Sequence, residues 1–473
     1  MTDEIPAMTD APSARRTPPL PSLDQAELAD ATADLREANL DFARRHPGDP
    51  PGRQPVHTVY GGAQLFSAES AARIGGVARR AMDDQLSTPA ALGEMLGMAG
   101  HGLLDAVHAR VREKLAREAV EDFRIDFEDG YGNRPDDEED HHAVVVGEAL
   151  VRGMNQGTLP PFIGIRVKTL TEELRLRAMR TLDIVLTTVV GEAGALPDHF
   201  VVTIPKVTLA EQVSYTVAVL QQLERRLGLG KRSLRFEVMV ETPQMVIDRE
   251  GRSLLPRLVE IAEGRLAGAH FGTYDYTASL NITAAHQRMG HPANDFAKHV
   301  MQVTLAGTGV WLSDGSTAVL PVPVHRTDGG STLTAGQQEE NRAAMRQAWR
   351  LHFHDVMHSL RGGFYQGWDL HPAQLVTRYA ALYMFFLEGI DAAGARLKNF
   401  VEKAAQATLV GNVFDDAATG QGLLNFFLRG INSGAITEAE ALRMTGLTEE
   451  DFRGRSFVRI MSAHAGASVD AAG

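Results

Sequence analysis

The feature of this sequence that most constrains its fold is the alternation of short apolar runs with longer amphipathic segments. Such alternation is typical of parallel β-strands joined by α-helices. The eight apolar runs span residues 57–63, 123–127, 162–167, 200–206, 234–241, 266–272, 319–324 and 364–370. Eight units favour a closed (β/α)8 barrel, the TIM barrel of the α/β class, over an open doubly wound sheet. No Gly-x-Gly-x-x-Gly follows any run, which weakens a dinucleotide-binding alternative.

Two stretches fit the barrel pattern less well. Residues 319–324 make the poorest strand, because their two prolines cannot donate to a sheet ladder. Residues 69–85 and 88–120 have helical spacing, and they make an unusually long excursion between the first two strands.

The pattern divides the chain into four segments. Residues 1–22 are rich in Pro, Ala, Ser and Thr, so we expect a disordered tail. Residues 23–56 have helical spacing that ends at consecutive prolines and glycines, which predicts an N-terminal helical extension. The barrel should occupy residues 57–375. We expect residues 376–473 to form a helical domain that caps the barrel or mediates oligomerisation, and the apolar stretch 379–387 predicts a buried interface, internal or within a homo-oligomer.

The composition limits the classes of function. A net charge of −13 argues against nucleic acid as a partner, because phosphate binding requires a basic surface. The absence of cysteine excludes disulfides, thiolate catalysis and zinc–sulfur sites. The chain has no apolar run of about 18 residues and no signal-peptide pattern, so we expect a cytoplasmic enzyme with no membrane partner.

Carboxylates cluster where the second apolar run ends. Asp126 and Glu128 alternate with Ile125 and Phe127, so the two acids share one face of a strand, and Asp129 follows them. Crowded carboxylates repel one another unless a cation or hydrogen-bond donors offset them. The stretch is therefore either a binding element with such a partner or a solvated acidic turn.

Charged or polar groups also end the later runs, and the C-terminal strand ends are where (β/α)8 barrels carry their catalytic groups. The residues at these positions include Arg166, Lys206, Glu241, Asp275 and His371. A single charge after an apolar strand is common, but a set of them around one barrel is not. We therefore expect these residues and the acidic stretch to form one site.

Glu241 and Asp275 are the candidate metal ligands. Two carboxylates on adjacent strands can bind Mg2+, or Mn2+ in its place, because these cations prefer oxygen ligands. Zinc is less favoured, because no histidine cluster with ligand spacing accompanies them. Each residue also has a simpler interpretation: Glu241 can pair with a helix N-terminus, and Asp275 can cap a helix.

Arg166 and Lys206 are the candidate cations of the site. Arg166 is costly to bury unpaired, so one interpretation gives it a partner among the acids at 126–129. A compatible functional interpretation is a fork that holds a carboxylate or a developing oxyanion. Lys206 can form a Schiff base, but that chemistry would not need paired metal carboxylates.

The order of these motifs resembles a known superfamily. Asp126-Phe-Glu-Asp-Gly, Ile165-Arg-Val, Ile204-Pro-Lys, Val240-Glu-Thr, Phe271-Gly-Thr-Tyr-Asp-Tyr and Gly367-Trp-Asp-Leu-His-Pro-Ala-Gln come in the order found in HpcH/HpaI aldolase and citrate lyase beta-subunit-like proteins. Those proteins are (β/α)8 barrels that bind Mg2+ and make or break a C–C bond next to a carboxylate or thioester. The resemblance implies that Glu241 and Asp275 hold the metal and that Arg166 is the catalytic substrate and oxyanion residue. We expect the others to bind substrate or to support the groups that do: Asp126, Glu128, Asp129, Lys206 and His371.

A second resemblance is to malate synthases, relatives with the same barrel. Residues 412–420 look like the segment of their C-terminal helical domain that carries the catalytic aspartate. By that resemblance Asp416 would be the catalytic base that removes a proton from acetyl-CoA; otherwise it only starts a helix. The chain departs from malate synthases at its third run, which reads Ile165-Arg-Val-Lys instead of an Arg-Pro-Arg-type strand.

Three functions follow from these patterns. The first is an Mg2+-dependent carbon–carbon lyase or aldolase that acts on a 2-oxo acid or an acyl-CoA through a metal-stabilised enolate. The second is a malate-synthase-like Claisen condensation of an acyl-CoA with glyoxylate. The third is a barrel that binds a ligand without catalysis, which the set of strand-end charges makes less favoured.

Overall fold

The chain divides into two compact units, Met1–Pro47 and Gly48–Gly473. The computed structural model describes residues 22–327, 332–402, 408–410, 413–415 and 417–461, without the side chains of 408–410, 413–415 and 417. The first unit contains α1 (Gln25–Ala31), capped by Asp24, and α2 (Ala33–Arg45). The predicted tail at 1–22 lies, apart from its last residue, outside the described residues.

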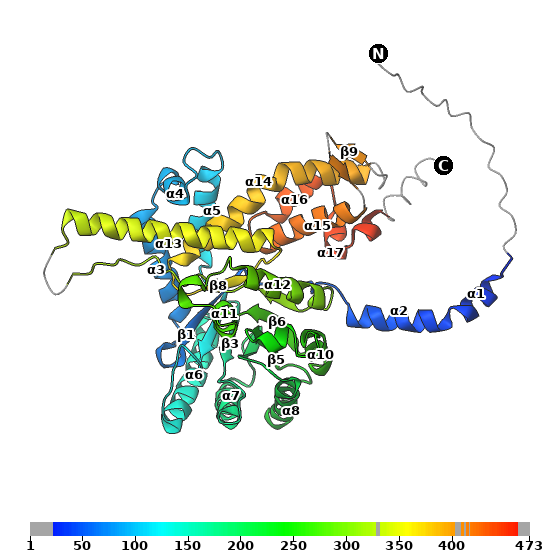
Figure 1. Ribbon diagram of the computed structural model, residues 1–473, viewed down its shortest axis with the longest axis horizontal. Helices are drawn as coiled ribbons and strands as arrows, with labels where there is room; N and C mark the ends of the chain where they lie inside the picture. The colour runs from blue at the N-terminus through cyan, green and yellow to red at the C-terminus, as the bar shows by residue number, and fades with distance from the viewer. Residues whose placement is uncertain (1–21, 328–331, 403–407, 411–412, 416, 462–473) are drawn as a thin grey trace, which may run out of the picture. The chain divides into compact units, whose positions relative to one another are not determined.

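Eight parallel strands of the second unit form the barrel (Figure 1). They are β1 (His57–Gly62), β2 (Asp122–Asp126), β3 (Phe162–Arg166), β4 (Phe200–Ile204), β5 (Arg235–Val240), β6 (Leu266–Phe271), β7 (Trp311–Ser313) and β8 (Gly367–Asp369). Strands that follow one another in the sequence lie side by side from β1 to β7, and β8 pairs with β1. The predicted (β/α)8 fold is confirmed.

The residues after β7 close the seam to β8. The N–H of Asp314 donates to the carbonyl of Gln366 at 2.8 Å, and the N–H of Trp368 donates to the carbonyl of Gly315 at 3.0 Å. The ammonium of Lys298 lies 2.9 Å from the Asp314 carboxylate and fixes it from outside the sheet. The seam is therefore held by two backbone hydrogen bonds, and a buried ion pair fixes the segment that follows β7.

Two predicted elements are wrong. Residues 319–324 form no strand, because their prolines cannot donate to a ladder, and β7 lies earlier in the chain. Residues 88–120 form two helices, α4 (Pro89–Leu96) and α5 (Leu104–Arg117), in place of one. Gly97 ends α4 in the left-handed conformation with φ 74°, which a glycine adopts without strain.

The helices that link the strands pack on the outside of the sheet. The remaining ones are α3 (Ser70–Gln85), α6 (Asp136–Gln156), α7 (Arg175–Ala193), α8 (Ala210–Leu227), α9 (Pro243–Val246), α10 (Leu255–Ile261), α11 (Thr273–Ser279), α12 (Pro292–Leu305) and α13 (Ala335–Arg361), with short 3-10 turns at Ala63–Leu65 and Ala284–His286. Each longer helix buries one apolar stripe; in α7 it contains Leu182, Leu186 and Val189. Figure 1 shows α6, α7 and α8 in a row on the outer side of the strands.

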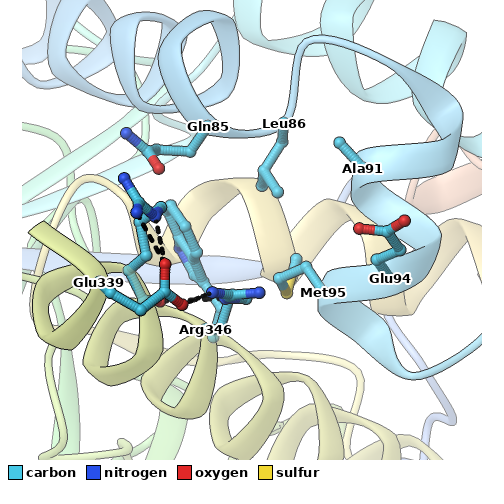
Figure 2. Close-up of a pocket in the computed structure, with 9 residues that line it drawn as sticks. Gln85, Leu86, Ala91, Glu94, Met95, Glu339 and Arg346 are labelled. Carbon is cyan, nitrogen blue, oxygen red and sulfur yellow. Dashed lines mark hydrogen bonds and ion pairs between the residues drawn. The ribbon is translucent and has the colours of Figure 1, made fainter. Parts of the chain in front are cut away.

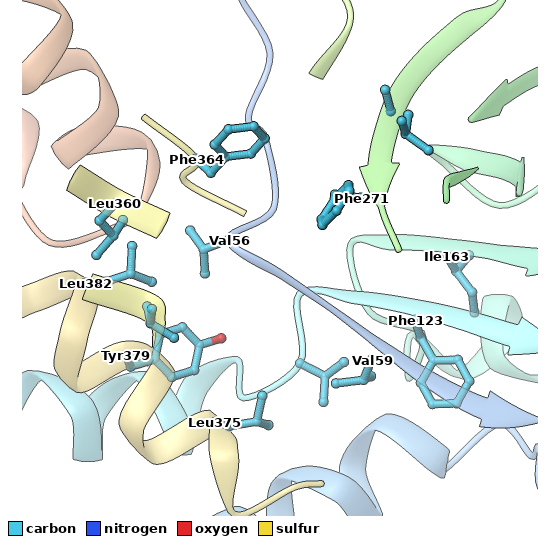
Figure 3. Packing of buried hydrophobic residues seen from close by; sticks show 14 of the residues in the cluster. Val56, Val59, Phe123, Ile163, Phe271, Leu360, Phe364, Leu375, Tyr379 and Leu382 are labelled. Atoms are coloured by element: carbon cyan, nitrogen blue, oxygen red, sulfur yellow. The ribbon is translucent and has the colours of Figure 1, made fainter. Parts of the chain in front are cut away.

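A helical region follows the barrel. It contains α14 (Gln374–Glu402), a hairpin of β9 (Thr408–Val410) and β10 (Val413–Asp415), and then α15 (Ala417–Asn432), α16 (Glu438–Thr445) and α17 (Glu449–Gly454). Helix α14 is buried inside the chain: Figure 3 shows its Tyr379 and Leu382 in the same cluster as Val56 and Leu360. The apolar stretch at 379–387 is thus largely covered by the chain itself, so the homo-oligomer remains only a prediction. Among the described helices, none combines the length and hydrophobicity needed to cross a bilayer.

Candidate active site

Polar side chains from the ends of β2 to β6 meet at the C-terminal end of the barrel. The structure brings together seven of the predicted site residues: Asp126, Glu128, Asp129, Arg166, Lys206, Glu241 and Asp275. His371 does not contact this group within the described residues. Asp416 lies outside the described residues. The strand-end pattern therefore located a cluster that comes from five different strands.

Arg166 is held by carboxylates and by two aromatic rings. Its Nε and Nη2 donate to the two oxygens of Asp126 at 2.7 and 2.6 Å, and its Nη1 lies 3.1 Å from Oε2 of Glu128. The centre of the guanidinium lies 4.7 Å from the centroid of the Tyr60 ring and 5.9 Å from that of Trp368. Burial opposes the charge of Arg166, but the Asp126 carboxylate outweighs it and raises the pKa of the guanidinium. This side chain is charged and fixed in orientation.

The acidic stretch is a structured turn rather than a solvated one. Asp126 accepts the backbone N–H of Glu128 at 3.0 Å and that of Gly130 at 2.7 Å, in addition to the guanidinium of Arg166. Asp126 and Glu128 are buried, whereas Asp129 is exposed. The turn thereby fixes Asp126 behind Arg166 and directs the Glu128 carboxylate into the site.

Lys206 lies at the centre of the carboxylates. Its ammonium is 2.5 Å from Oε1 of Glu128, 3.1 Å from Asp129 and 3.4 Å from Asp275. Burial opposes the charged ammonium, but Glu241 and Glu128 outweigh it and raise the pKa of Lys206 above its usual value. A Schiff base requires the free amine, so this environment disfavours that role.

The backbone of Lys206 also takes part in the site. Its φ is 50°, a left-handed conformation that costs a non-glycine residue about 1–2 kcal/mol. In this conformation its N–H donates to Oε1 of Glu241 at 2.7 Å. One residue therefore fixes Glu241 through its main chain and three other carboxylates through its side chain.

Glu241 is almost completely buried, with 1% of its surface exposed. Burial raises its pKa to about 8, against the effect of Lys206 and with a further contribution from the negative charge of Asp275. The Glu241 carboxylate accepts its hydrogen bond from the N–H of Lys206. The structure therefore does not show the pairing of Glu241 with a helix N-terminus that was the simpler interpretation. Asp275 does not cap α11 either, because the N-cap is Gly272; its half-exposed carboxylate faces Lys206 instead.

Two residues near the strand ends have structural roles. The ring of His371 accepts the N–H of Ala373 at 3.2 Å, at the start of α14. The Lys168 ammonium donates to the carbonyls of Phe127 and Gly132 and lies 3.3 Å from Glu139. Lys168 therefore holds the acidic turn from behind.

Sequence reasoning missed the residues inside the barrel. The rings of Tyr60 and Trp368 pack at a tilt of 32°, with centroids 4.5 Å apart, and form one wall beside Arg166. Beneath them, Arg124 donates to both oxygens of Glu237, at 2.7 and 2.9 Å, and His270 lies 3.0 Å from the same carboxylate. The sequence did contain a sign of the Arg124 cluster, because Arg124 is a charge in the middle of an apolar strand. Alternation along the strand places it on the same face as Asp126.

The donor chemistry of the cluster fits a divalent cation. Within the described residues, no group of three or more His, Asp or Glu side chains has the arrangement of a metal site. Mg2+, however, is commonly held by one or two carboxylates together with water and substrate, so two carboxylates such as Glu241 and Asp275 would be enough to hold it. Three carboxylates contact the single ammonium of Lys206, and a fourth, Glu241, lies on its main-chain N–H. A divalent cation would offset this excess of negative charge.

A pocket elsewhere on the surface is not lined by a comparable cluster of carboxylates and cations. It has a volume of about 360 Å3 and lies between α3, α4 and α13 (Figure 2). Both of its arginines, Arg342 and Arg346, contact the carboxylate of Glu339 at 2.7 Å. Both arginines are thus already paired, and none of the predicted site residues lines the pocket.

Comparisons with known proteins identify a family for the chain and solved structures with a similar fold. The model of a family described as "Domain of unknown function (DUF6986)" matches residues 35–460. No curated protein matches the sequence significantly. Among solved structures, a citrate lyase from Burkholderia xenovorans LB400 is similar with a TM-score of 0.53 and 17% identity, over 85% of this chain and 99% of that one. A malate synthase from Haloferax volcanii, in its magnesium and glyoxylate complex, gives a TM-score of 0.44 and 14% identity, over 85% and 99% of the two chains. At 17% identity, the citrate lyase comparison shows a shared fold alone.

Proposed function

Because the chain belongs to the DUF6986 family, whose description assigns no activity, we propose a function from the site itself. The protein is a divalent-cation-dependent carbon–carbon lyase or aldolase that acts next to the carboxylate of a 2-oxo acid or the thioester of an acyl-CoA. One observation carries this proposal: buried Glu241 and neighbouring Asp275 lie at the same barrel end as Arg166, which is fixed between aromatic rings and Asp126.

Glu241 and Asp275 would hold Mg2+, or Mn2+ in its place. When bound, the cation would supply positive charge that attracts a substrate carboxylate and offsets negative charge formed during C–C cleavage. Glu241 suits this task because it is buried and its Oε1 is fixed by the N–H of Lys206. Asp275 suits it because its carboxylate is half-exposed and accessible to a ligand entering from solvent.

Arg166 would stabilise the oxyanion of the enolate. A guanidinium has five N–H donors, and Arg166 donates to Asp126 from Nε and Nη2. Donors that Asp126 does not use can bind a substrate oxygen, and the fixed guanidinium loses little conformational freedom when they do. Tyr60 and Trp368 pack against the guanidinium and shield it from water, which strengthens such hydrogen bonds.

Proton transfer is assigned by resemblance. Asp416 is the proposed base, and its replacement in Asp416→Asn should remove most activity while the other site residues stay in place. If that variant keeps full activity, the proton must be carried by another group.

The test is turnover by the purified protein with Mg2+, offered pyruvate plus simple aldehydes and, separately, glyoxylate plus acetyl-CoA. Pyruvate loss without thiol release supports the aldolase reaction, and glyoxylate-dependent thiol release supports a malate-synthase-like condensation. Glu241→Gln should abolish metal-dependent turnover and leave the fold intact, whereas Glu192→Gln, an exposed position on α7, should change neither. Retained activity in Glu241→Gln would overturn the metal assignment.

A further inference from the structure

Lys206 occupies the position where the carboxylates of the site concentrate their negative charge. Its ammonium contacts Glu128, Asp129 and Asp275, which follow β2 and β6, and its own main chain binds Glu241. A cation held by Glu241 and Asp275 must therefore share the carboxylate of Asp275 with this ammonium, close to Glu241. The side chain is only partly buried, with 27% of its surface exposed, so it has room to withdraw.

We propose that Lys206 is a built-in competing cation: its ammonium holds the carboxylates together in the metal-free protein and must withdraw before a divalent ion binds. The inference rests on the proposed function, because it takes Glu241 and Asp275 as the metal ligands. It goes further by stating what sets the affinity of the site for metal.

The backbone conformation supports this assignment. The left-handed φ of Lys206 fixes the residue next to Glu241, and the N–H contact to Oε1 does not depend on the side chain. Withdrawal of the ammonium therefore leaves Glu241 in place. It releases Glu128, Asp129 and Asp275 from the ammonium at the same time, because one nitrogen contacts all three.

Electrostatics gives the direction of the effect. Two positive groups that share carboxylates a few ångströms apart repel each other, and each weakens the binding of the other. Removing the ammonium should therefore strengthen metal binding by about tenfold or more. If Lys206 instead helped to build the metal site, its removal would weaken binding.

The experiment is a Mn2+ titration of the full-length protein, followed by calorimetry and by the electron paramagnetic resonance of free Mn2+. Lys206→Met removes the charge, and Lys206→Asn removes it with a residue that tolerates the left-handed backbone. Lys231→Met is the matched control, because it removes an exposed lysine from the loop before β5, at the opposite end of the barrel. We expect both Lys206 variants to bind Mn2+ about tenfold more tightly than the wild type, and Lys231→Met to bind it unchanged.

A second readout is the melting temperature in EDTA and in saturating Mn2+. In EDTA the Lys206 variants should have a lower melting temperature than the wild type, because their carboxylates repel one another. Saturating Mn2+ should raise their melting temperature by more than it raises that of the wild type. Unchanged or weaker Mn2+ binding in folded Lys206 variants, beside a wild type that binds, would overturn this inference alone. If neither the wild type nor the variants bind Mn2+, the proposed function fails and this inference fails with it.

Discussion

Gly272 lies directly against the carboxylate of Glu241: a Cβ at position 272 would be 2.3 Å from Oε2 of Glu241 and 2.5 Å from its Cβ. Gly272 follows β6 at the point where the chain turns into α11, and Glu241 follows the neighbouring β5. The absence of a side chain at 272 is therefore what allows Glu241 its buried position.

We expect Gly272→Ala to displace the Glu241 side chain and to reduce turnover by about a hundredfold, because misplacement by about 1 Å has effects of this size. Mn2+ affinity should fall as well, while the circular dichroism spectrum stays unchanged. Gly290→Ala is the control, since a Cβ there meets nothing within 4 Å. Normal Mn2+ affinity in Gly272→Ala would show that the position of Glu241 is unimportant.

Arg166→Lys keeps a positive charge but replaces a planar fork with a point charge. It loses the paired hydrogen bonds to Asp126 and the packing on Tyr60 and Trp368. We expect kcat to fall by about 10²–10³, the range found when an oxyanion donor is removed. The comparison is Arg180→Lys, which changes an exposed arginine with a similar two-donor contact to Asp140. Equal effects of the two substitutions would contradict the role of Arg166.

The pair Arg124–Glu237 should be costly to break, because both side chains are 4% exposed. Arg124→Met leaves the Glu237 carboxylate inside the barrel, where His270 and Thr203 are its remaining polar partners among the described residues. We expect the free energy of unfolding to fall by about 3–5 kcal/mol, measured by urea denaturation. Arg249→Met removes an equally short ion pair with exposed Glu250, and no measurable change is expected there.

His57 should make the stability depend on pH. Burial lowers its pKa from 6.5 to about 4, against the nearby charges of Asp369 and Glu121. Its Nε2 accepts the N–H of Glu121 at 3.1 Å, so the folded protein requires the neutral ring. Between pH 6.5 and pH 4, His57 binds a proton in the unfolded chain but not in the folded protein. The contribution of neutral His57 to the free energy of unfolding is therefore complete above pH 6.5 and is lost as the pH falls to 4.

The free energy of unfolding of the wild type and of His57→Gln is measured by urea denaturation at about pH 7 and about pH 4.5. The glutamine can also accept the N–H of Glu121. The stability of the wild type relative to the variant should fall by about 2 kcal/mol over this interval. His325→Gln, at a more exposed histidine, controls for general acid effects. A difference that is constant with pH would mean that His57 is not held neutral.

The sequence predicted those parts of the molecule that depend on local order along the chain. Alternating runs predicted the barrel, and strand ends located the group around Lys206 and a partner for Arg166 among the acids at 126–129, which the structure shows to include Asp126. β7 was placed wrongly because three residues are too short to show a period, and a proline-rich apolar run offered a stronger pattern. The contact between Tyr60 and Trp368 could not be predicted, because a closed barrel makes the first and last strands neighbours without fixing their register.

The pairing of β1 with β8 has a consequence for synthesis on the ribosome. His57 is among the first barrel residues to leave the exit tunnel, and its partner Gly367 is among the last. Until then β1 has an exposed edge on the side that β8 later covers, and that edge can pair with the strands of another nascent chain. Helices α3, α4 and α5 lie between β1 and β2 in the sequence, so the other edge of β1 also stays uncovered until β2 has emerged.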